Sequence, residues 1–350
     1  MWFFPAALFF YYLYKMKLEY SFIIPVYNRP EEIRELLQSM LALDFDRPYE
    51  IVIVEDGSSK PSEEVIKQFQ QQLDISYYYK ENTGPGDSRN FGMRNAKGDY
   101  FIILDSDVLL PPEYLKTVDS FLTENFCDCY GGPDAAHPGF SDTQKAIDYA
   151  MTSFLTTGGI RGKKSSVNKF EPRSFNMGIS REAFEDTGGF GLIHPGEDPD
   201  LSLRLQKNGS KTCLIPNAKV FHKRRIDWNK FYHQVEKFGM VRPILNSWHP
   251  GSAKITYWFP SLFMACLILS IFLLSNGLWW FFGLYMAYFM AVLLDSAIKN
   301  KSLHIGLYSV YAVLVQFAGY GYGFFKSVWQ LKVLKKNPEI AFPHLFFKHA

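Results

Sequence analysis

The first part of the chain alternates between two kinds of hydrophobic pattern. Short apolar runs rich in β-branched and aromatic residues predict buried strands, and segments with apolar residues every three or four positions predict amphipathic helices. The predicted strands are residues 20–26, 49–56, 75–80 and 99–107, and the predicted helices between them are residues 30–43, 62–73 and 86–96. This order indicates an α/β fold with a mainly parallel, doubly wound sheet. In such sheets ligands bind outside the carboxyl ends of the strands.

Long runs without charged residues follow at residues 255–275, 277–294 and 303–325. Each is about as long as a stretch that crosses a bilayer as a helix. Trp279 and Trp280 lie near an end of a run, where aromatic residues favour the membrane interface. A buried helical domain of a soluble protein is the alternative, but three such runs are hard to bury in a chain of 350 residues. We therefore expect a multi-pass membrane protein with membrane lipids as partners.

The basic residues that flank these runs do not agree with three complete crossings. Lys254, the segment 299–301 and the segment 332–336 are all basic, and all favour the cytoplasmic face. An odd number of crossings cannot place all three there. Either one run is re-entrant or interfacial, or the N-terminal segment takes part in the crossing.

Two further segments favour the membrane surface. Residues 1–17 begin with an apolar stretch that is short for a span and lacks the features of a cleaved signal peptide, so we interpret them as membrane-associated. Residues 226–250 carry aromatic residues at helical spacing together with lysines, which predicts an amphipathic interfacial helix. The chain thus divides into a membrane-associated segment, an α/β domain, an interfacial helix, transmembrane helices and a basic tail, at residues 1–17, 18–225, 226–250, 251–328 and 329–350.

Charge and cysteine content narrow the picture. The formal net charge of +2 argues against a nucleic-acid partner. Cys127, Cys129, Cys213 and Cys266 show neither a metal-binding spacing nor a disulfide framework, so we expect reduced thiols in a domain that faces the cytoplasm. The chemistry of the chain must therefore be sought in its polar motifs.

Polar residues follow three of the predicted strands, at the edge where ligands are expected. The first strand runs into residues 25–29, the second into residues 55–59 and the fourth into residues 105–107. Asp56 lies in a tight turn, and its carboxylate can accept hydrogen bonds from a nucleotide base or a ribose. The candidate binding residues at the first two strand ends are Pro25, Tyr27, Asn28 and Asp56.

Asp105 and Asp107 stand one residue apart where an uncharged apolar run ends. Their carboxylate oxygens, completed by phosphate oxygens and water, suit Mg²⁺ or Mn²⁺. A metal bound there would neutralise a diphosphate and stabilise it as a leaving group. Two solvated loop aspartates are the alternative, and the position directly after a buried strand favours the metal.

The segment between the third and fourth strands has the features of an anion site. Gly84 and Gly86 let a phosphate or a ribose approach the backbone at the start of the next helix. Arg89 lies one turn inside that helix and can reach an anion, whereas Arg94 is a weaker candidate. A surface helix with ordinary arginines is the alternative.

Together these motifs resemble the inverting family 2 glycosyltransferases with the GT-A fold, a Rossmann-like mixed, mainly parallel sheet. The resemblance covers about residues 20–225 and rests on FIIPVYNRPEEIRELLQSM, IVIVEDGSS, NTGPGDSRNFGMRNAKGDYFIILDSDV, FNMGISREAFEDTGGF and GEDPDLSLRLQKNG, in that order. It implies transfer of a sugar from a nucleotide diphosphate sugar, with Mn²⁺ or Mg²⁺ on the paired aspartates. By the resemblance Asp56 contacts the base, Arg89 approaches the nucleotide and Asp105 contacts the ribose or sugar. Asp107 then binds the metal.

The late motif carries the expected base. Glu197 and Asp198 open a predicted helix, where the helix dipole stabilises carboxylates. Inversion needs one base that takes the proton of the acceptor hydroxyl, and Asp198 matches the family's base position, with Glu197 as its neighbour. The alternative is a capping pair without chemistry. His222 follows a probable strand and, as in some members of the family, would complete the metal shell.

One departure from the family pattern bears on the product. Processive synthases of this family carry a Gln-x-x-Arg-Trp motif in this region, whereas here Gln234 is followed by VEKFG. This favours the addition of one or a few sugars. A uridine nucleotide is the family's commonest donor and is expected here by resemblance only.

The resulting hypothesis is a membrane-bound inverting glycosyltransferase whose catalytic domain faces the cytoplasm. It would move a sugar, from a UDP-sugar by resemblance, to a lipid-linked or cell-envelope glycan acceptor. The alternative is a catalytically silent, membrane-anchored protein that binds nucleotide sugars or assists assembly, against which Asp105, Asp107 and Asp198 argue. A nucleotidyltransferase would need a lysine in a glycine-rich loop after the first strand, and residues 25–32 offer neither.

Overall fold

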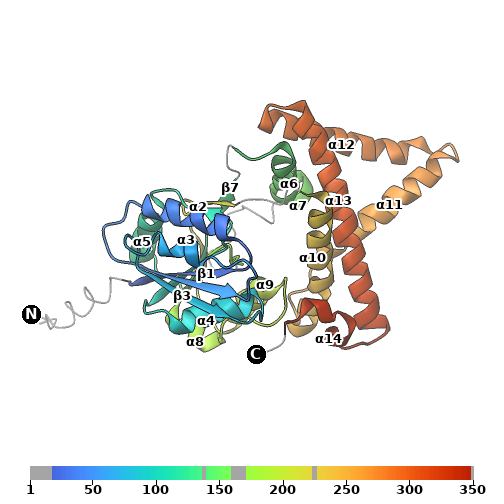
Figure 1. Cartoon of the computed structure of the whole chain (residues 1–350). Coiled ribbons are helices and arrows are strands. Elements are labelled where there is room, and N and C mark those ends of the chain that lie inside the picture. The colour runs from blue at the N-terminus through green and yellow to red at the C-terminus, as the bar shows by residue number, and fades with distance from the viewer. Residues whose placement is uncertain (1–17, 136–138, 159–170, 223–226, 348–350) are drawn as a thin grey trace, which may run out of the picture. The chain divides into compact units, whose positions relative to one another are not determined.

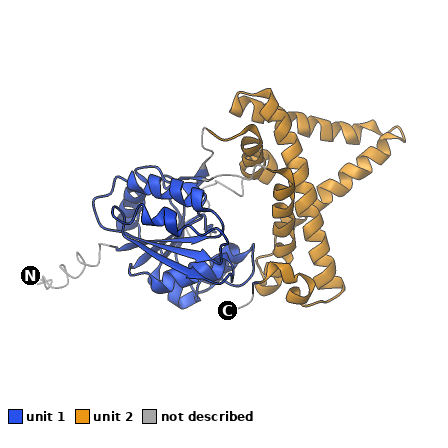
Figure 2. Ribbon diagram, in the orientation of Figure 1, with its two compact units in different colours: residues 1–135, 164–222, 347–350 blue, residues 136–163, 223–346 orange. Residues whose placement is uncertain are grey.

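The computed structural model describes residues 18–135, 139–158, 171–222 and 227–347. The predicted membrane-associated segment 1–17 lies outside the described residues. The chain forms two compact units (Figure 2). Unit 1 comprises residues 1–135, 164–222 and 347–350, and unit 2 comprises residues 136–163 and 223–346.

Unit 1 is built on a mixed, mainly parallel sheet of seven strands in the order β3-β2-β1-β4-β8-β6-β9. The strands are β1 (Tyr20–Val26), β2 (Glu50–Asp56), β3 (Ile75–Lys80), β4 (Tyr100–Leu104), β6 (Cys129–Gly131), β8 (Asn176–Ser180) and β9 (Thr212–Leu214). The first four strands are parallel, as the sequence predicts, and β8 lies antiparallel between β4 and β6. The prediction of a mainly parallel α/β sheet is therefore confirmed.

Two layers of helices cover the sheet, one on each face (Figure 1). They are α2 (Pro30–Leu41), α3 (Glu63–Lys67) and α5 (Tyr114–Glu124) on one face, and α4 (Pro85–Asn95), α8 (Arg181–Thr187) and α9 (Glu197–Lys207) on the other. Successive side chains of β1 alternate between them, with Phe22 and Ile24 in the first core cluster and Ile23 in the second. Each such fully buried apolar side chain contributes roughly 1.5–3 kcal/mol to folding.

Two predicted elements are shorter in the structure. The helix predicted over 62–73 ends at Lys67 and continues as turns, in which Phe69 and Leu73 keep the apolar spacing and remain in the same core cluster. The strand predicted over 99–107 ends at Leu104, so that Asp105 and Asp107 lie in the loop that follows. The shorter strand places both aspartates beyond the carboxyl end of β4.

A small second sheet lies next to these aspartates in the chain. It has the order β5-β10-β7, with β5 (Val108–Leu109), β10 (Val220–His222) and β7 (Asp134–Ala135). β10 pairs antiparallel with β5, and His222 stands opposite Val108. This pairing brings the backbone of His222 beside the residue that follows Asp107.

The cysteine prediction is wrong for one pair. Cys127 and Cys213 form a disulfide, with their Cα atoms 6.4 Å apart, whereas both were expected as reduced thiols. Parallel pairing of β6 with β9 brings the two segments together, and their separation of 86 residues hides this from the sequence. Cys129 is a free, buried thiol.

Unit 2 is helical. Its elements are α6 (Asp142–Thr152), α7 (Phe154–Thr157), α10 (Trp228–Trp248), η1 (Ile255–Trp258), α11 (Phe259–Leu274), α12 (Trp279–Asn300), α13 (Leu303–Val328), η2 (Trp329–Val333), α14 (Pro338–Ala341) and η3 (Pro343–Leu345). By length and composition, Ile255–Leu274, Trp279–Asn300 and Leu303–Val333 are able to cross a membrane. α6 and α7 come from the segment between β7 and β8, within residues 18–225, and pack with the C-terminal helices.

Candidate active site

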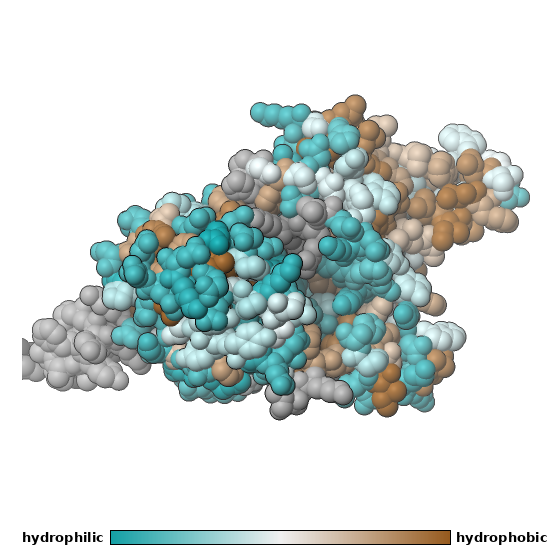
Figure 3. Space-filling model, viewed as in Figure 1, coloured by the Kyte–Doolittle hydropathy of each residue, from teal (hydrophilic) through white to brown (hydrophobic). Residues whose placement is uncertain are grey.

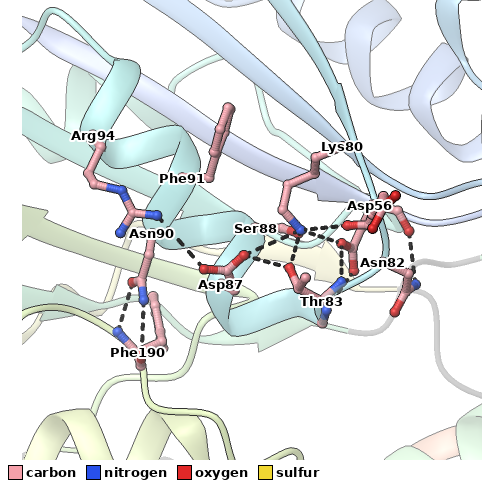
Figure 4. A network of polar contacts seen from close by, with 12 residues as sticks. Asp56, Lys80, Asn82, Thr83, Asp87, Ser88, Asn90, Phe91, Arg94 and Phe190 are labelled. Carbon is pink, nitrogen blue, oxygen red and sulfur yellow. Dashed lines mark hydrogen bonds and ion pairs between the residues drawn. The ribbon is translucent and has the colours of Figure 1, made fainter. Parts of the chain in front are cut away.

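Asp56, the last residue of β2, holds the turn that leads into α4 (Figure 4). Its carboxylate accepts hydrogen bonds from the backbone N–H groups of Thr83 and Gly84, each 3.0 Å long, and its carbonyl accepts one of 2.8 Å from Asn82 Nδ2. Asp56 is buried. The carboxylate thus fixes the backbone at the start of α4, and its contact with a nucleotide base stays a prediction.

Lys80, the last residue of β3, is a site residue that the sequence analysis did not identify. Its Nζ lies 2.7 Å from Asp56 Oδ1 and 3.3 Å from Asp87 Oδ2, and it also donates to Thr83 Oγ1 (Figure 4). Thr83 Oγ1 in turn donates to Asp87. Lys80 therefore ties the ends of two strands to the first turn of α4. The sequence signal that could have identified Lys80 is its position as the last residue of a predicted strand, at the edge where ligands are expected.

The turn at Gly84 is closed by a residue from the far end of the chain. Gly84 has a positive φ of 96°, and a Cβ built there would lie 2.4 Å from the ring of Phe347. The backbone N–H of Phe347 donates to Leu192 O at 3.0 Å, and its ring centroid lies 6.1 Å from that of His194. Phe347 thus packs between the turn before α4 and the loop before α9. No local signal in the sequence predicts this contact.

Arg89 joins three elements at the centre of the site. Its Nη2 donates to Asp105 Oδ1 at 2.8 Å, and its Nη1 donates to Glu197 Oε1 at 3.1 Å. The guanidinium lies over the ring of Phe190, 5.2 Å from its centroid. Burial lowers the pKa of Arg89, but Asp105, Glu197 and Asp198 raise it more, so its pKa lies above the ordinary value and the cation persists.

Asp107 is paired with a second arginine. Arg29, which precedes α2, donates from Nη1 to Asp107 Oδ2. Burial lowers the pKa of Arg29, but Asp107 raises it more, so the net pKa shift is upward. Each carboxylate of the paired aspartates therefore faces a guanidinium. Arg29 belongs to the polar end of the first strand, but its role as a partner of Asp107 was not predicted.

The other predicted residues of the first strand end have different surroundings. The amide oxygen of Asn28 accepts from Ser59 Oγ at 3.0 Å and from Lys60 N at 2.9 Å, so Asn28 braces the turn after β2. The side chain of Tyr27 is exposed, and Pro25 is half-buried in β1. Tyr27 is thus free to contact a ligand, and Asn28 has a structural partner.

The predicted metal ligands form an incomplete shell among the described residues. No group of three or more histidine, cysteine, aspartate or glutamate side chains able to hold a metal occurs in the described ranges. Asp105 and Asp107 supply hard carboxylate oxygens, which fit Mn²⁺ or Mg²⁺. The side chain of His222, the third predicted ligand, lies outside what the structure describes. The donor chemistry fits such a metal, with phosphate oxygens completing the coordination.

Glu197 and Asp198, at the start of α9, have opposite electrostatic surroundings. Glu197 Oε1 lies 2.9 Å from His194 Nδ1 and also accepts from Arg89. Burial raises the pKa of Glu197, but His194 and Arg89 lower it more, so the net shift is downward. The pKa of His194 shifts in the opposite direction: burial lowers it, but Glu197 raises it more, so the net shift is upward.

Asp198 has a carboxylate oxygen without a fixed donor. Its Oδ2 accepts from the backbone N–H of Ser174 at 3.1 Å, and its buried Oδ1 has no hydrogen-bond partner within the described part of the chain. Burial and the neighbouring charge of Glu197 raise the pKa of Asp198, against the opposing effects of Arg89 and Arg173. Two adjacent carboxyl groups thus have pKa values pushed apart, as in an acid–base site.

The remaining candidates lie elsewhere. Asp200 pairs with Arg204 on α9, with Nε–Oδ2 and Nη2–Oδ2 distances of 3.0 and 2.8 Å. Arg94 is exposed, 3.8 Å from Asp87. Arg89 and Glu197 are buried, and with the partly buried Asp105 and Asp198 they form one cluster of charged side chains.

Comparison with known proteins gives one family and several relatives. The profile described as Glycosyl transferase family 2 matches residues 21–188. An uncharacterized glycosyltransferase of Rickettsia felis is 37% identical over 105 residues, which are 30% of this chain and 17% of that protein. The poly(ribitol-phosphate) beta-N-acetylglucosaminyltransferase TarS of Staphylococcus aureus is 31% identical over 114 residues, 32% of this chain and 20% of that protein. The chain thus matches about a fifth of the length of these relatives.

Solved structures show the same fold. The mannosyltransferase PcManGT of Pyrobaculum calidifontis, solved with GDP-Man and Mn²⁺, superposes with a TM-score of 0.58 at 17% sequence identity. The match covers 93% of this chain and 96% of that one. Residues 1–349 of Staphylococcus aureus TarS give a TM-score of 0.50 at 16% identity, over 91% of this chain and 92% of that one. At such identity the likeness concerns the fold alone.

Proposed function

From the match of residues 21–188 to the glycosyltransferase family 2 profile and from the shared fold, we propose that the protein is a membrane-bound inverting glycosyltransferase. It moves a sugar from a nucleotide diphosphate sugar to an acceptor hydroxyl. The observation that carries the proposal is the cluster in which Arg89 bridges Asp105 and Glu197, while the buried Oδ1 of Asp198 has no hydrogen-bond donor among the described residues.

The donor is held at the carboxyl ends of the strands. Asp56 and Lys80 fix the turn before α4, where the ring of Phe347 packs on Gly84. Arg89 is positioned to face the diphosphate, and Asp105 to contact the ribose or sugar. We propose a uridine nucleotide as the donor. The relative TarS, named as an N-acetylglucosaminyltransferase, supports sugar transfer, and the mannosyltransferase solved with GDP-Man makes a guanosine nucleotide the comparison to test.

Asp107, Asp105 and His222 are the residues proposed to hold Mn²⁺ or Mg²⁺. The strand register supports this, because His222 stands opposite Val108, the residue after Asp107. When bound, the ion supplies positive charge that stabilises the leaving diphosphate. Arg29 and Arg89 pair with the same two carboxylates. These cations are near enough to interact with phosphate oxygens themselves.

Asp198 is proposed as the general base. Its carboxylate takes the proton of the acceptor hydroxyl as that oxygen attacks the anomeric carbon, opposite the bond to the leaving diphosphate. Glu197 stays ionised through His194 and Arg89, and its negative charge makes Asp198 a better proton acceptor. Glu197 is thus a positioning residue next to the base.

The apolar helices of unit 2 support membrane attachment. We propose that the acceptor is a lipid-linked or cell-envelope glycan, and that the catalytic domain faces the cytoplasm, where basic flanking segments favour it. The second candidate, a silent nucleotide-sugar-binding protein, is disfavoured by Asp198. Its buried Oδ1 has no hydrogen-bond partner among the described residues, a destabilising feature that a role in the reaction explains.

The test uses the full chain, purified in detergent and incubated with UDP-sugars and GDP-sugars in Mn²⁺. The measurement is the release of nucleoside diphosphate in the presence of membrane lipid extract. We expect release with at least one sugar, and its loss in Asp198→Asn. Binding of a nucleotide sugar without release, under all conditions and with an acceptor extract, would support the silent binding protein instead.

A further inference from the structure

The three long apolar helices of unit 2 have different surroundings. Within their apolar windows, 11% of residues are buried in Ile255–Leu274, 17% in Trp279–Asn300 and 39% in Leu303–Val333. Large apolar side chains of α11 and α12 are exposed, among them Leu262, Ile268, Phe272, Trp279, Leu284 and Met290. Figure 1 shows α11 and α12 leaving the rest of unit 2 as a hairpin, and Figure 3 shows hydrophobic residues gathered over it.

α13, in contrast, is packed closely along α10. A Cβ on Gly323 would lie 2.1 Å from Glu236 O, and a Cβ on Gly319 would lie 2.7 Å from a methyl carbon of Val235. Gly239 of α10 approaches Tyr320 O in the same way, at 2.2 Å. Only glycines allow such contact between two helix backbones. One face of α13 is therefore covered by protein.

α6 covers α13 closer to its start. His304 Nδ1 lies 2.9 Å from Asp142 Oδ2 of α6. Ala312 and Val313 of α13 share a buried cluster with Ile147 of α6 and Phe231 of α10. α6 and α10 thus accompany α13 along much of its length.

These two companion helices are too polar for the interior of a bilayer. Their ionisable residues are Asp142, Lys145 and Asp148 on α6, and Lys230, His233, Glu236, Lys237 and Arg242 on α10. Ionised side chains are among the costliest groups to place in hydrocarbon. If α13 crossed the membrane, it would carry these helices in with it. The packing of α13 therefore argues against a crossing.

Both ends of α13 lie beside the polar ends of the α11–α12 hairpin. At its start, only Lys301 and Ser302 separate Leu303 from the end of α12 at Asn300. Asp295 of α12 accepts a hydrogen bond of 2.6 Å from Tyr149 of α6. At its other end, Phe324 packs on Trp258, which precedes α11, with ring centroids 4.9 Å apart.

A pocket lies between the start of α11 and the end of α13. It is lined by Lys254 and Trp258, before α11, and by Phe324, Val328 and Lys332, at the end of α13 and in η2. The two open ends of a hairpin inserted from one side lie at the same membrane face. α13 connects these two ends, and so both of its own ends lie at that face.

We propose that, of the residues the structure describes, only the α11–α12 hairpin enters the bilayer, and that α13 lies with α10 and α6 along the face from which the hairpin enters. The inference rests on the membrane attachment proposed above and not on the transfer reaction. It removes the conflict among the basic segments, because Lys254, 299–301 and 332–336 then all meet one leaflet. The anionic lipids of the cytoplasmic leaflet attract such segments.

The test labels single cysteines with a membrane-impermeant maleimide, in intact cells and in inverted vesicles. The full chain carries Cys266→Ala together with one of Glu64→Cys in unit 1, Asn276→Cys at the hairpin tip, Lys301→Cys before α13 or Lys336→Cys after it. We expect Lys301→Cys and Lys336→Cys to react in the same preparation as Glu64→Cys. We also expect Asn276→Cys not to react in that preparation.

Other labelling patterns contradict the proposal in identifiable ways. Reaction of Lys301→Cys and Lys336→Cys in opposite preparations shows that α13 crosses the membrane. Reaction of Asn276→Cys together with both shows that the hairpin does not enter. Protein released from membranes by alkaline extraction contradicts the attachment itself. If Lys301→Cys and Lys336→Cys react from the same face but the protein releases no nucleotide, the proposed topology is supported and only the proposed reaction is contradicted.

A charge placed on each helix gives a second readout. Ile268→Lys on α11 and Tyr311→Lys on α13 both alter large, exposed side chains. We expect Ile268→Lys to lower the membrane-inserted fraction and Tyr311→Lys to leave it near the wild-type level. Equal loss in both variants would show that α13 meets the hydrocarbon as α11 does.

Discussion

The carboxylates at the strand ends and the carboxylate of Asp198, at the start of α9, have different partners. Asp56, Asp105 and Asp107 each face a cation, namely Lys80, Arg89 and Arg29. Asp198 has one backbone donor on Oδ2 and no partner on its buried Oδ1 among the described residues. A carboxylate that pairs with a cation holds the geometry of the site, whereas burial and the charge of Glu197 raise the pKa of Asp198 and make it a proton acceptor. The comparison separates the binding half of the site from the reacting half.

The largest effect is expected from removing the residue that joins both halves. Arg89→Ala leaves the buried carboxylate of Glu197 and the partly exposed carboxylate of Asp105 without their common cation. Removing one partner of a buried ion pair costs about 3–5 kcal/mol of folding stability, and solvent screening reduces the share of Asp105. Thermal unfolding of the detergent-solubilised chain, together with nucleotide release, measures both losses. Arg89→Lys keeps the charge but not the fork of donors, and we expect it to recover stability more than activity. Unchanged unfolding of Arg89→Ala would show that the bridge is not structural.

Asp107→Ala tests the binding half alone. We expect the Mn²⁺-dependent part of UDP binding to disappear. Loss of a residue that supports a metal site typically lowers affinity by about tenfold or more, and we expect a loss of at least that size here. Calorimetry with UDP, in Mn²⁺ and in EDTA, measures it. Asp99→Ala is the matched control, since Asp99 is exposed and precedes β4 at the opposite end of the strand. Equal binding in EDTA and in metal, or full binding by Asp107→Ala, argues against the metal role.

The pH dependence of turnover tests the reacting half. Burial and Glu197 raise the pKa of Asp198 from 3.8 to about 6. The carboxylate is the active form of a base, so turnover should rise as pH increases through about 6 and then level off. Stability has the opposite sign: the native state binds the proton more tightly, so this group's contribution to the free energy of unfolding falls as pH rises through the same range. A turnover profile that stays flat from pH 5 to pH 8 would contradict the assignment.

The smallest effect is expected at the C-terminus. Phe347→Ala removes the ring that packs on Gly84 and His194. An aromatic contact of this kind is worth about 0.5–1.5 kcal/mol, so we expect the KM for the donor to rise a few-fold while kcat changes little. Phe346→Ala is the matched control, because its ring faces Trp248 in unit 2. Equal KM values in the two variants would remove Phe347 from the site.

Much of the site could be predicted because its signals are local. The change from an apolar run to polar residues marks each strand end, so Asp56, Asp105 and Asp107 follow from their own neighbours in sequence. The order of strands and helices then brings these ends to one edge, where Arg89 also belongs. The prediction of a mixed, mainly parallel sheet is confirmed for the same reason.

The partners of these residues could not be predicted, because they come from distant parts of the chain. Arg29 and Asp107 are 78 residues apart, and Arg89 and Glu197 are 108 apart. Phe347 and the Cys127–Cys213 disulfide depend likewise on the finished fold. Composition shows that α13 is less apolar than α11, but only their packing shows which of the two is covered by other helices.

Asp198→Asn tests the central claim most directly, measured as turnover and donor affinity on the same preparation. The amide keeps the size of the side chain but cannot take a proton. We expect turnover to fall by about 10²–10⁴, with UDP-sugar affinity nearly unchanged. Glu197→Gln, which loses its ion pairs with Arg89 and His194, should instead disturb donor binding. Retained turnover in Asp198→Asn, or a parallel loss of donor affinity, would contradict the division between a binding half and a reacting half.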